Sequence, residues 1–361
     1  MIQPDPRADW LQPQPAETAL ALPAHCYVDE AVAAAERSAV FRSGWQLLAH
    51  AAQVAGSGDH AVADVAGLPL VLVRGSDGVL RALHNVCRHR AGPLATCDGR
   101  GATHLVCRYH GWTYALDGRL RGAPEMGRST DFDPATIALP QARLAEWHGL
   151  VFAAAEDTAP PFEELVAGID ARAGAALADL AFDRRVVYEV ACNWKVYVDN
   201  FLEGYHLPHV HPALNRVLDY RSYTTTLAPW SVLQASPIDA SSGPYARGEA
   251  LYYWLYPNTM LNILPGRLQT NRVIPLGVDR CRVEFDFYYA PDAGALRAGD
   301  LSFSDAVQDE DTAICEAVQR GLASGSYTAG RLNPLCEQGV WHFHELLRAA
   351  YRRARAQPPR R

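Results

Sequence analysis

Residues 281–289, CRVEFDFYY, carry the clearest periodic pattern in the chain, because apolar and polar side chains alternate along them. One parity holds Cys281, Val283, Phe285, Phe287 and Tyr289, and the other holds Arg282, Glu284, Asp286 and Tyr288. Successive side chains of a strand point to opposite faces of its sheet. The pattern therefore predicts a half-buried antiparallel strand.

The remaining patterns divide the chain into β-rich and helical stretches. From about 41 to 155, short β-like runs alternate with glycine turns, and a second β-rich block covers about 222–290. Helical patterns lead into Trp45, recur at about 163–180 and 193–210, and fill the chain from about 303 onwards. Pro160 and Pro161 mark a boundary, since neither a strand nor a helix interior accepts them. An α+β protein of two domains is predicted.

Composition and charge exclude several classes of partner. The 361 residues are 49% apolar and 20% charged, as in ordinary globular proteins, and the net charge of −7 provides no basic surface for nucleic acid. The start of the chain lacks the basic and apolar runs of a signal peptide, and no stretch is apolar enough to span a bilayer. We expect a cytoplasmic protein with neither nucleic acid nor membrane as a partner.

Two short loops offer one cysteine and one histidine each: Cys87-Arg88-His89 and Cys107-Arg108-Tyr109-His110. A [2Fe–2S] cluster with two thiolates on one iron and two imidazoles on the other requires such a pair of loops. The alternative is a Cys₂His₂ zinc site, for which this spacing is unusual. The other six cysteines are interpreted as buried free thiols.

A second cluster of metal-binding residue types lies at 193–212, NWKVYVDNFLEGYHLPHVHP. Non-haem iron(II) oxygenases hold iron with two histidines and one carboxylate. His206 and His211 are the expected pair, with a helix that bends or ends at the prolines between and after them. Glu203, three residues before His206, is placed to hydrogen-bond that ligand from behind, and Asp199 is a weaker alternative. His209 is interpreted as a supporting or solvent-facing residue, and the third ligand is one of several acids in 305–316.

Over almost its whole length the chain resembles the α-subunits of Rieske non-haem iron oxygenases. The resemblance implies that Cys87, His89, Cys107 and His110 hold the cluster, and that His206, His211 and Asp311 hold the mononuclear iron, with Asp309 as the fallback. It implies that Glu203 bridges the iron site to a cluster histidine of a neighbouring subunit in a homotrimer, although the family more often has Asp there. It also implies that electrons come from NAD(P)H through a separate flavin and iron–sulfur reductase, with a ferredoxin as a further carrier left open.

The same resemblance implies three parts of the chain: an N-terminal segment 1–40 packing on the catalytic domain, a Rieske domain at 41–155, and a helix-grip catalytic domain at 156–361. The carboxy-terminal half resembles choline monooxygenases and related quaternary ammonium oxygenases, in 256–277, 305–334 and 341–347.

This subgroup implies hydroxylation or N-demethylation of a small quaternary ammonium or betaine-like substrate with O₂. The expected substrate contacts are aromatic side chains that can surround an N-methylated cation: Tyr205, Trp230, Tyr252 and Trp254. The alternative is hydroxylation of an aromatic ring or aromatic acid, whose carboxylate would need an arginine such as Arg267 or Arg272. Whether one or both oxygen atoms are incorporated stays open.

Overall fold

The computed structural model describes residues 10–356, which form two compact units. One consists of Phe41–Pro160, and the other combines the described residues of Met1–Val40 and Pro161–Arg361. The first unit is thus inserted into the sequence of the second.

The unit Phe41–Pro160 is built from two antiparallel sheets. Its six-stranded sheet has the order β1-β9-β8-β4-β3-β2, with β1 Gln46–His50, β2 His60–Val65, β3 Leu68–Arg74, β4 Leu80–His84, β8 Gln141–Trp147 and β9 Leu150–Ala154. A three-stranded sheet contains β5 Leu105–Val106, β6 Thr113–Tyr114 and β7 Leu120–Gly122. One apolar core of this unit includes Cys87 and Cys107 together with Leu83, Trp112 and Tyr114.

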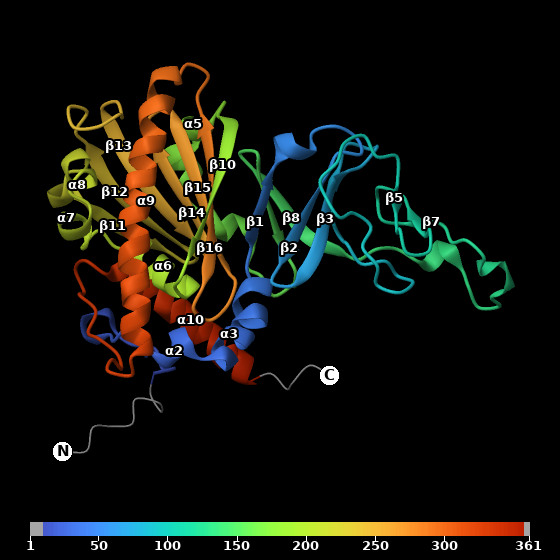
Figure 1. The fold of residues 1–361 in the computed structure, drawn as a ribbon, viewed down its shortest axis with the longest axis horizontal. Coiled ribbons are helices and arrows are strands. Elements are labelled where there is room, and N and C mark those ends of the chain that lie inside the picture. The colour runs from blue at the N-terminus through green and yellow to red at the C-terminus, as the bar shows by residue number, and fades with distance from the viewer. Residues whose placement is uncertain (1–9, 357–361) are drawn as a thin grey trace. The chain divides into compact units, whose positions relative to one another are not determined.

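The other unit contains a seven-stranded antiparallel sheet of order β10-β16-β15-β14-β13-β12-β11. The strands are β10 Ala181–Val190, β11 Thr224–Ala228, β12 Ser231–Ile238, β13 Gly248–Leu255, β14 Thr259–Leu264, β15 Arg267–Pro275 and β16 Cys281–Tyr289. Neighbours β11 to β16 follow one another along the chain, and β10 pairs beyond β16. Figure 1 shows this sheet with the long helix α9 Gly294–Ala323 crossing it.

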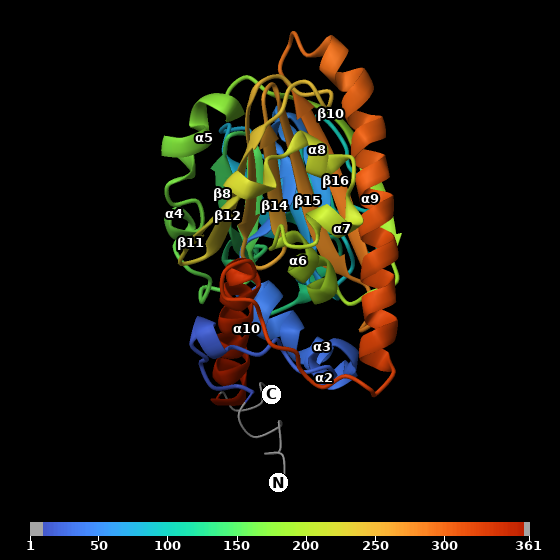
Figure 2. The same cartoon turned by 90° about the vertical axis from the view of Figure 1, so that its left-hand side faces the viewer.

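Short helices and α9 lie over one face of this sheet (Figure 2). The short helices are α6 Trp194–Phe201, α7 Leu207–Val210 and α8 Leu214–Val217. The remaining α-helices in the described part of the unit are α2 His25–Val28, α3 Glu30–Glu36, α4 Phe162–Leu165, α5 Ile169–Leu177 and α10 Gln338–Ala356. The mixed α and β architecture with antiparallel sheets agrees with the predicted fold class.

Three predicted elements differ from the structure. The helix expected at 163–180 is two helices, because Gly168 adopts a left-handed conformation (φ 78°) between α4 and α5. The helix expected at 193–210 already ends at Phe201, and Pro208 lies in the first turn of α7, where the missing N–H has no partner to lose. The helical tail begins at Gly294 rather than near 303.

The strand at 281–289 is buried on both faces instead of one. The polar parity is covered because its acids are paired within the sheet. Asp286 binds Arg185 (Oδ1–Nε 2.6 Å) and Glu284 binds Arg272 (Oε2–Nη2 2.6 Å). Paired carboxylates can be withdrawn from water in this way, whereas alternation alone suggests a solvated face.

The thiols also differ in part from the expectation. All eight cysteines are free, and four of the six outside the two loops are buried: Cys26, Cys192, Cys281 and Cys315. Cys97 is exposed and Cys336 is half-buried, so the prediction of burial was wrong for these two.

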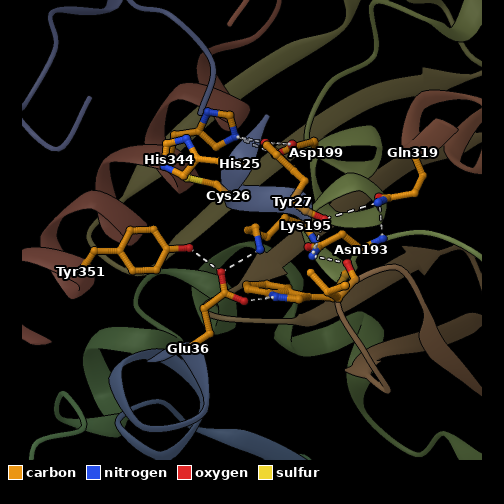
Figure 3. A network of polar contacts seen from close by, with 12 residues as sticks. His25, Cys26, Tyr27, Glu36, Asn193, Lys195, Asp199, Gln319, His344 and Tyr351 are labelled. Carbon is orange, nitrogen blue, oxygen red and sulfur yellow. Dashed lines mark hydrogen bonds and ion pairs between the residues drawn. The ribbon is translucent and has the colours of Figure 1, made fainter. Parts of the chain in front are cut away.

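A buried ion pair joins the N-terminal segment to α6 and α10 (Figure 3). Glu36 and Lys195 are 1% and 0% exposed, and the Lys195 Nζ lies 2.7 Å from Glu36 Oε1. The same carboxylate accepts from Trp194 Nε1 at 2.8 Å and from the Tyr351 hydroxyl. Three donors thus satisfy a carboxylate that would otherwise be costly to bury.

Candidate metal centres and substrate cavity

Two histidines and one aspartate of the larger unit converge at the end of a cavity. His206 caps the start of α7, His211 caps its end, and Asp311 lies on α9. One ligand atom from each lies within 4.8 Å of the others. Asp311 Oδ1 is 3.0 Å from His211 Nε2 and 3.9 Å from His206 Nε2. The break between α6 and α7 allows the two rings to face one point, and their donor set fits a 2-His-1-carboxylate iron site.

Each of these histidines has a carboxylate on its outer nitrogen. Glu203 Oε1 lies 2.6 Å from His206 Nδ1, and Glu203 Oε2 accepts the backbone N–H of His206 at 3.0 Å. Glu310 Oε2 lies 2.7 Å from His211 Nδ1. Such partners orient the imidazoles with Nε2 toward the metal position. Burial opposes protonation of His211, but Asp311 and Glu310 outweigh it and raise the pKa of the ring.

The structure separates the two acids that were candidates for the third ligand. Asp311 shares the inward face of α9 with Gln308 and Cys315, and it accepts from Asn200 Nδ2 at 2.6 Å. Asp309 lies on the exposed side of the same helix. The roles of Glu310 and Asn200 were not predicted. The only sequence indication for either was its place beside residues already singled out as candidates.

Asp199, the weaker alternative to Glu203, is engaged elsewhere (Figure 3). It accepts from the Tyr27 hydroxyl at 2.7 Å and lies 2.9 Å from His344 Nε2. His344 Nδ1 accepts the backbone N–H of Leu22, so its proton is on Nε2 and is donated to Asp199. His209 is exposed, in line with a solvent-facing position.

In the smaller unit, the two Cys/His loops have the same backbone form. The N–H of Cys87 donates to Gly92 O and its carbonyl accepts from Ala91, as Cys107 does with Trp112 and Gly111. Ala91 and Gly111 both take positive φ, 57° and 71°. The two thiols are buried, whereas the rings of His89 and His110 are exposed with centroids 4.6 Å apart.

The surroundings of the loops are closely packed. Trp112 stacks on the His89 ring at 4.9 Å, and the buried Tyr114 hydroxyl lies 3.3 Å from Cys87 Sγ. A Cβ at Gly92 would lie 3.0 Å from Cys107 Sγ, so glycine allows the loops to approach each other. Two buried thiols beneath two surface imidazoles fit a [2Fe–2S] cluster of the Rieske type.

Comparison with known proteins identifies the domain in which each of the two sites lies. Residues 44–142 match the Rieske [2Fe-2S] domain, and residues 177–353 match the catalytic domain of the ring hydroxylating alpha subunit. Choline monooxygenase of Arabidopsis thaliana is 36% identical over 353 residues, 92% of this chain and 83% of that protein. The chain belongs to the Rieske non-haem iron oxygenase family.

Other relatives of this oxygenase include the carnitine monooxygenase oxygenase subunit of Escherichia coli (strain K12), 31% identical over 93% of this chain and 95% of that one. The structure of the quaternary ammonium Rieske monooxygenase CntA with L-carnitine superposes with a TM-score of 0.82 and 27% identity, over 94% and 99% of the two chains. Naphthalene 1,2-dioxygenase from Rhodococcus sp., at 19% identity and a TM-score of 0.73, shares the fold.

Family membership makes the chain an oxidoreductase that incorporates oxygen from O₂, with a Rieske cluster and a mononuclear iron. Membership of this family therefore favours a [2Fe–2S] cluster over a zinc ion at the Cys/His loops. Within residues 10–356, no helix is both long and apolar enough to cross a membrane.

The cavity of the oxygenase next to the triad measures about 110 Å³. Of the four aromatic residues predicted to contact substrate, only Tyr252 lines it. Trp254 has the same strand parity but lies further along β13, where Phe343 of α10 covers it at 5.2 Å. Trp230 donates to Glu164, and Tyr205 is 48% exposed. These three assignments were therefore wrong.

Other rings line the cavity in their place: Tyr197, Phe201, Tyr223, Tyr245, Phe285 and Phe303. They come from α6, β16, α9 and the segments between α8 and β13. The alternation at 281–289 does assign Phe285 to one face of its strand. The other rings have no shared sequence signal, because the cavity is assembled from separate elements.

Proposed function

We propose that this chain is the terminal oxygenase component of a monooxygenase that hydroxylates or N-demethylates a small quaternary ammonium substrate. The observation that carries this proposal is the opening of the His206, His211 and Asp311 site into a cavity rich in aromatic rings. An N-methylated cation is attracted to ring faces and has no hydrogen-bond donor to satisfy. The names of the relatives, choline monooxygenase and carnitine monooxygenase, support the same substrate class.

His206, His211 and Asp311 would hold the mononuclear Fe(II), which supplies activation of O₂ when bound. Glu203 and Glu310 fix the two imidazoles through their outer nitrogens. Asn200 holds Asp311 Oδ1 from the side of α6. The aromatic walls orient the cation and exclude water from the reacting carbon. Each protein group thus has a positioning task at a stated atom.

Incorporation of one oxygen atom of O₂ consumes two electrons and two protons and releases one water. Attack on an N-methyl carbon gives a carbinolamine that loses formaldehyde, which amounts to demethylation. Attack on the alcohol carbon of choline gives an aldehyde hydrate. Both outcomes require the reacting carbon to lie beside the cation, at the end of the cavity that holds the triad.

Electrons reach the site from NAD(P)H through a separate reductase and the Rieske cluster of Cys87, His89, Cys107 and His110. The exposure of both histidine rings supports transfer to another protein surface. Glu203 and His206 also line a second cavity of about 640 Å³. In a homotrimer, this side of Glu203 would receive the partner subunit's His110. The similar structure of a quaternary ammonium Rieske monooxygenase gives insights into inter-subunit electron transfer, which supports such an arrangement.

The test is reconstitution with a surrogate reductase of this class. We expect choline, carnitine or γ-butyrobetaine to stimulate NAD(P)H consumption. Formaldehyde, an aldehyde or a tertiary amine should form in proportion to the NAD(P)H consumed. Hydrogen peroxide should be measured alongside, because uncoupled reduction of O₂ consumes NAD(P)H without product. Turnover of aromatic acids in the absence of any quaternary ammonium turnover would refute the proposal in favour of the ring-hydroxylating alternative.

A further inference from the structure

One strand gives the cavity a polar wall. Arg267, Gln269 and Asn271 of β15 all line the cavity, as alternate residues of a strand must when they share a face. Gln269 Nε2 donates to Asn271 Oδ1 at 2.8 Å, Arg267 Nη2 donates to Gln269 Oε1, and Ser304 of α9 donates to the same oxygen at 3.3 Å. The wall is therefore a connected row of hydrogen bonds.

Arg267 is held in this wall by a carboxylate that is itself fully bonded. Arg267 is 3% exposed, and its Nε lies 2.8 Å from Oδ2 of Asp300, which is 0% exposed. Asp300 also accepts from the hydroxyls of Tyr245 at 2.7 Å and Tyr289 at 2.6 Å. The pairing lets a guanidinium remain buried before any ligand arrives, which an unpaired cation could not do cheaply.

The pairing does not use all the donors of Arg267. A guanidinium has five N–H groups. Nη2 donates a hydrogen bond to Gln269, whereas Nε lies 2.8 Å from Asp300 as an ion pair without hydrogen-bond geometry. Among the described residues, none makes a hydrogen bond to Nη1. Asp300 does not line the cavity, whereas Arg267 does. A ligand in the cavity therefore meets N–H donors of a cation rather than its counter-ion.

Helix α9 sets this cation at a distance from the triad. Asp300, which holds Arg267, and Asp311, which belongs to the triad, lie on the same helix, α9. Their 11-residue separation (311 − 300) corresponds to about 16 Å along the axis at roughly 1.5 Å per residue. Ser304 and Gln308 line the cavity between them. The cavity thus has the triad toward one end and a guanidinium toward the other.

We propose that Arg267 determines specificity by receiving the carboxylate of a zwitterionic quaternary ammonium substrate. This role rests on the proposed function and narrows its substrate class to betaines with a carboxylate, in preference to the alcohol choline. The carboxylate pairs with the free edge of Arg267 while the trimethylammonium group lies among the rings near the triad. An arginine in the cavity was expected for an aromatic-acid substrate. It suits a betaine equally well, because both kinds of ligand carry a carboxylate.

Arg272 provides a matched control within the same strand. It is half-buried and paired with a carboxylate, Glu284 at 2.6 Å, but it has the opposite strand parity and does not line the cavity. Arg267→Lys keeps the charge and loses the planar fork. Arg267→Gln combined with Asp300→Asn removes both charges together, so that no carboxylate is left unpaired in the core.

Binding of L-carnitine, γ-butyrobetaine, choline and benzoate is measured by calorimetry on the oxidised protein, followed by kcat/KM in the reconstituted system. The wild type should bind both betaines more tightly than choline. Either Arg267 variant should lower the ratio of betaine to choline affinity by roughly 10- to 100-fold, the loss expected for a hydrogen bond to a charged group. Arg272→Lys should leave that ratio unchanged. Melting curves and the Rieske absorbance verify that each variant is folded.

Three results would overturn the role of Arg267. Choline could bind the wild type as tightly as the betaines, or the variants could weaken choline and betaines equally, which indicates a structural role. If either of these two results is obtained while choline is still turned over normally, the role of Arg267 is refuted but the proposed function is not. Turnover of benzoate without turnover of any quaternary ammonium compound would overturn both.

Discussion

Glu203→Gln tests the most consequential contact of the iron site. Glu203 uses both oxygens on one residue, His206: Oε1 lies 2.6 Å from the ring Nδ1 and Oε2 is 3.0 Å from the backbone nitrogen. If Nε2 of His206 faces the metal, Nδ1 carries the proton, so both contacts are donated to the carboxylate. Glutamine can accept one of them, and its NH₂ must then face the other donor.

The expected effect follows from this geometry. The substitution removes one charge-assisted hydrogen bond, worth about 1.5–3 kcal/mol, and opposes a donor to a donor at nearly constant volume. Loss of a partner behind a metal ligand typically reduces metal affinity or activity by roughly 10- to 100-fold. If Glu203 also bridges to the partner subunit's His110, transfer of electrons between the two centres should slow by that factor while both metals remain bound.

The assay is single turnover: pre-reduced enzyme is mixed with O₂ and substrate, and reoxidation of the Rieske cluster is followed by absorbance. Glu310→Gln is the matched comparison, because Glu310 contacts the outer nitrogen of His211 at 2.7 Å. It should cost iron affinity but slow reoxidation far less than Glu203→Gln when rates are expressed per bound iron. Wild-type reoxidation in Glu203→Gln, or equal slowing in both variants, would refute the bridge.

Three further predictions concern metal content and stability. Purified protein should contain about three irons and two acid-labile sulfides per chain, and stoichiometric zinc without sulfide would contradict both sites. Asp311→Ala should lose mononuclear iron and turnover but keep the Rieske spectrum, whereas the exposed Asp309→Ala should be nearly silent in metal analysis; the reverse would make Asp309 the ligand. Lys195→Met should destabilise the protein by about 3–5 kcal/mol in chemical unfolding, because it leaves Glu36 charged and buried. Adding Glu36→Gln should restore much of that loss, and no recovery would show that packing rather than charge is responsible.

Where the chemistry is local, the sequence indicated groups of residues that the structure brings together. The cluster motif lies within two short loops, and His206 and His211 lie within one stretch, so their residue types and spacing were enough to indicate them. Asp311 is about a hundred residues away, and resemblance to a family was needed to select it from its acidic neighbours. Its selection agrees with helix phase, since Asp309 is rotated to the exposed side of α9.

The parts that could not be predicted depend on tertiary contacts. Trp254 and Tyr252 have the same residue class and the same strand parity, and only the position of α10 assigns one to the core and the other to the cavity. The burial of Glu284 and Asp286 likewise depends on arginines from neighbouring strands. A period of two identifies a strand, but it does not show which faces become covered.

The ion pair between Glu36 and Lys195 has a consequence for synthesis of the chain. Lys195 is synthesised 159 residues after Glu36, and Tyr351 is synthesised 315 residues after it. The whole unit Phe41–Pro160 is synthesised between Glu36 and Lys195. At a synthesis rate of about 5–20 residues per second, the interval between Glu36 and Tyr351 lasts roughly 16–60 s. The inserted unit can therefore fold on the ribosome before the unit around it is complete. During this time the carboxylate of Glu36 stays hydrated, and it can be buried only once its partners on α6 and α10 are in place.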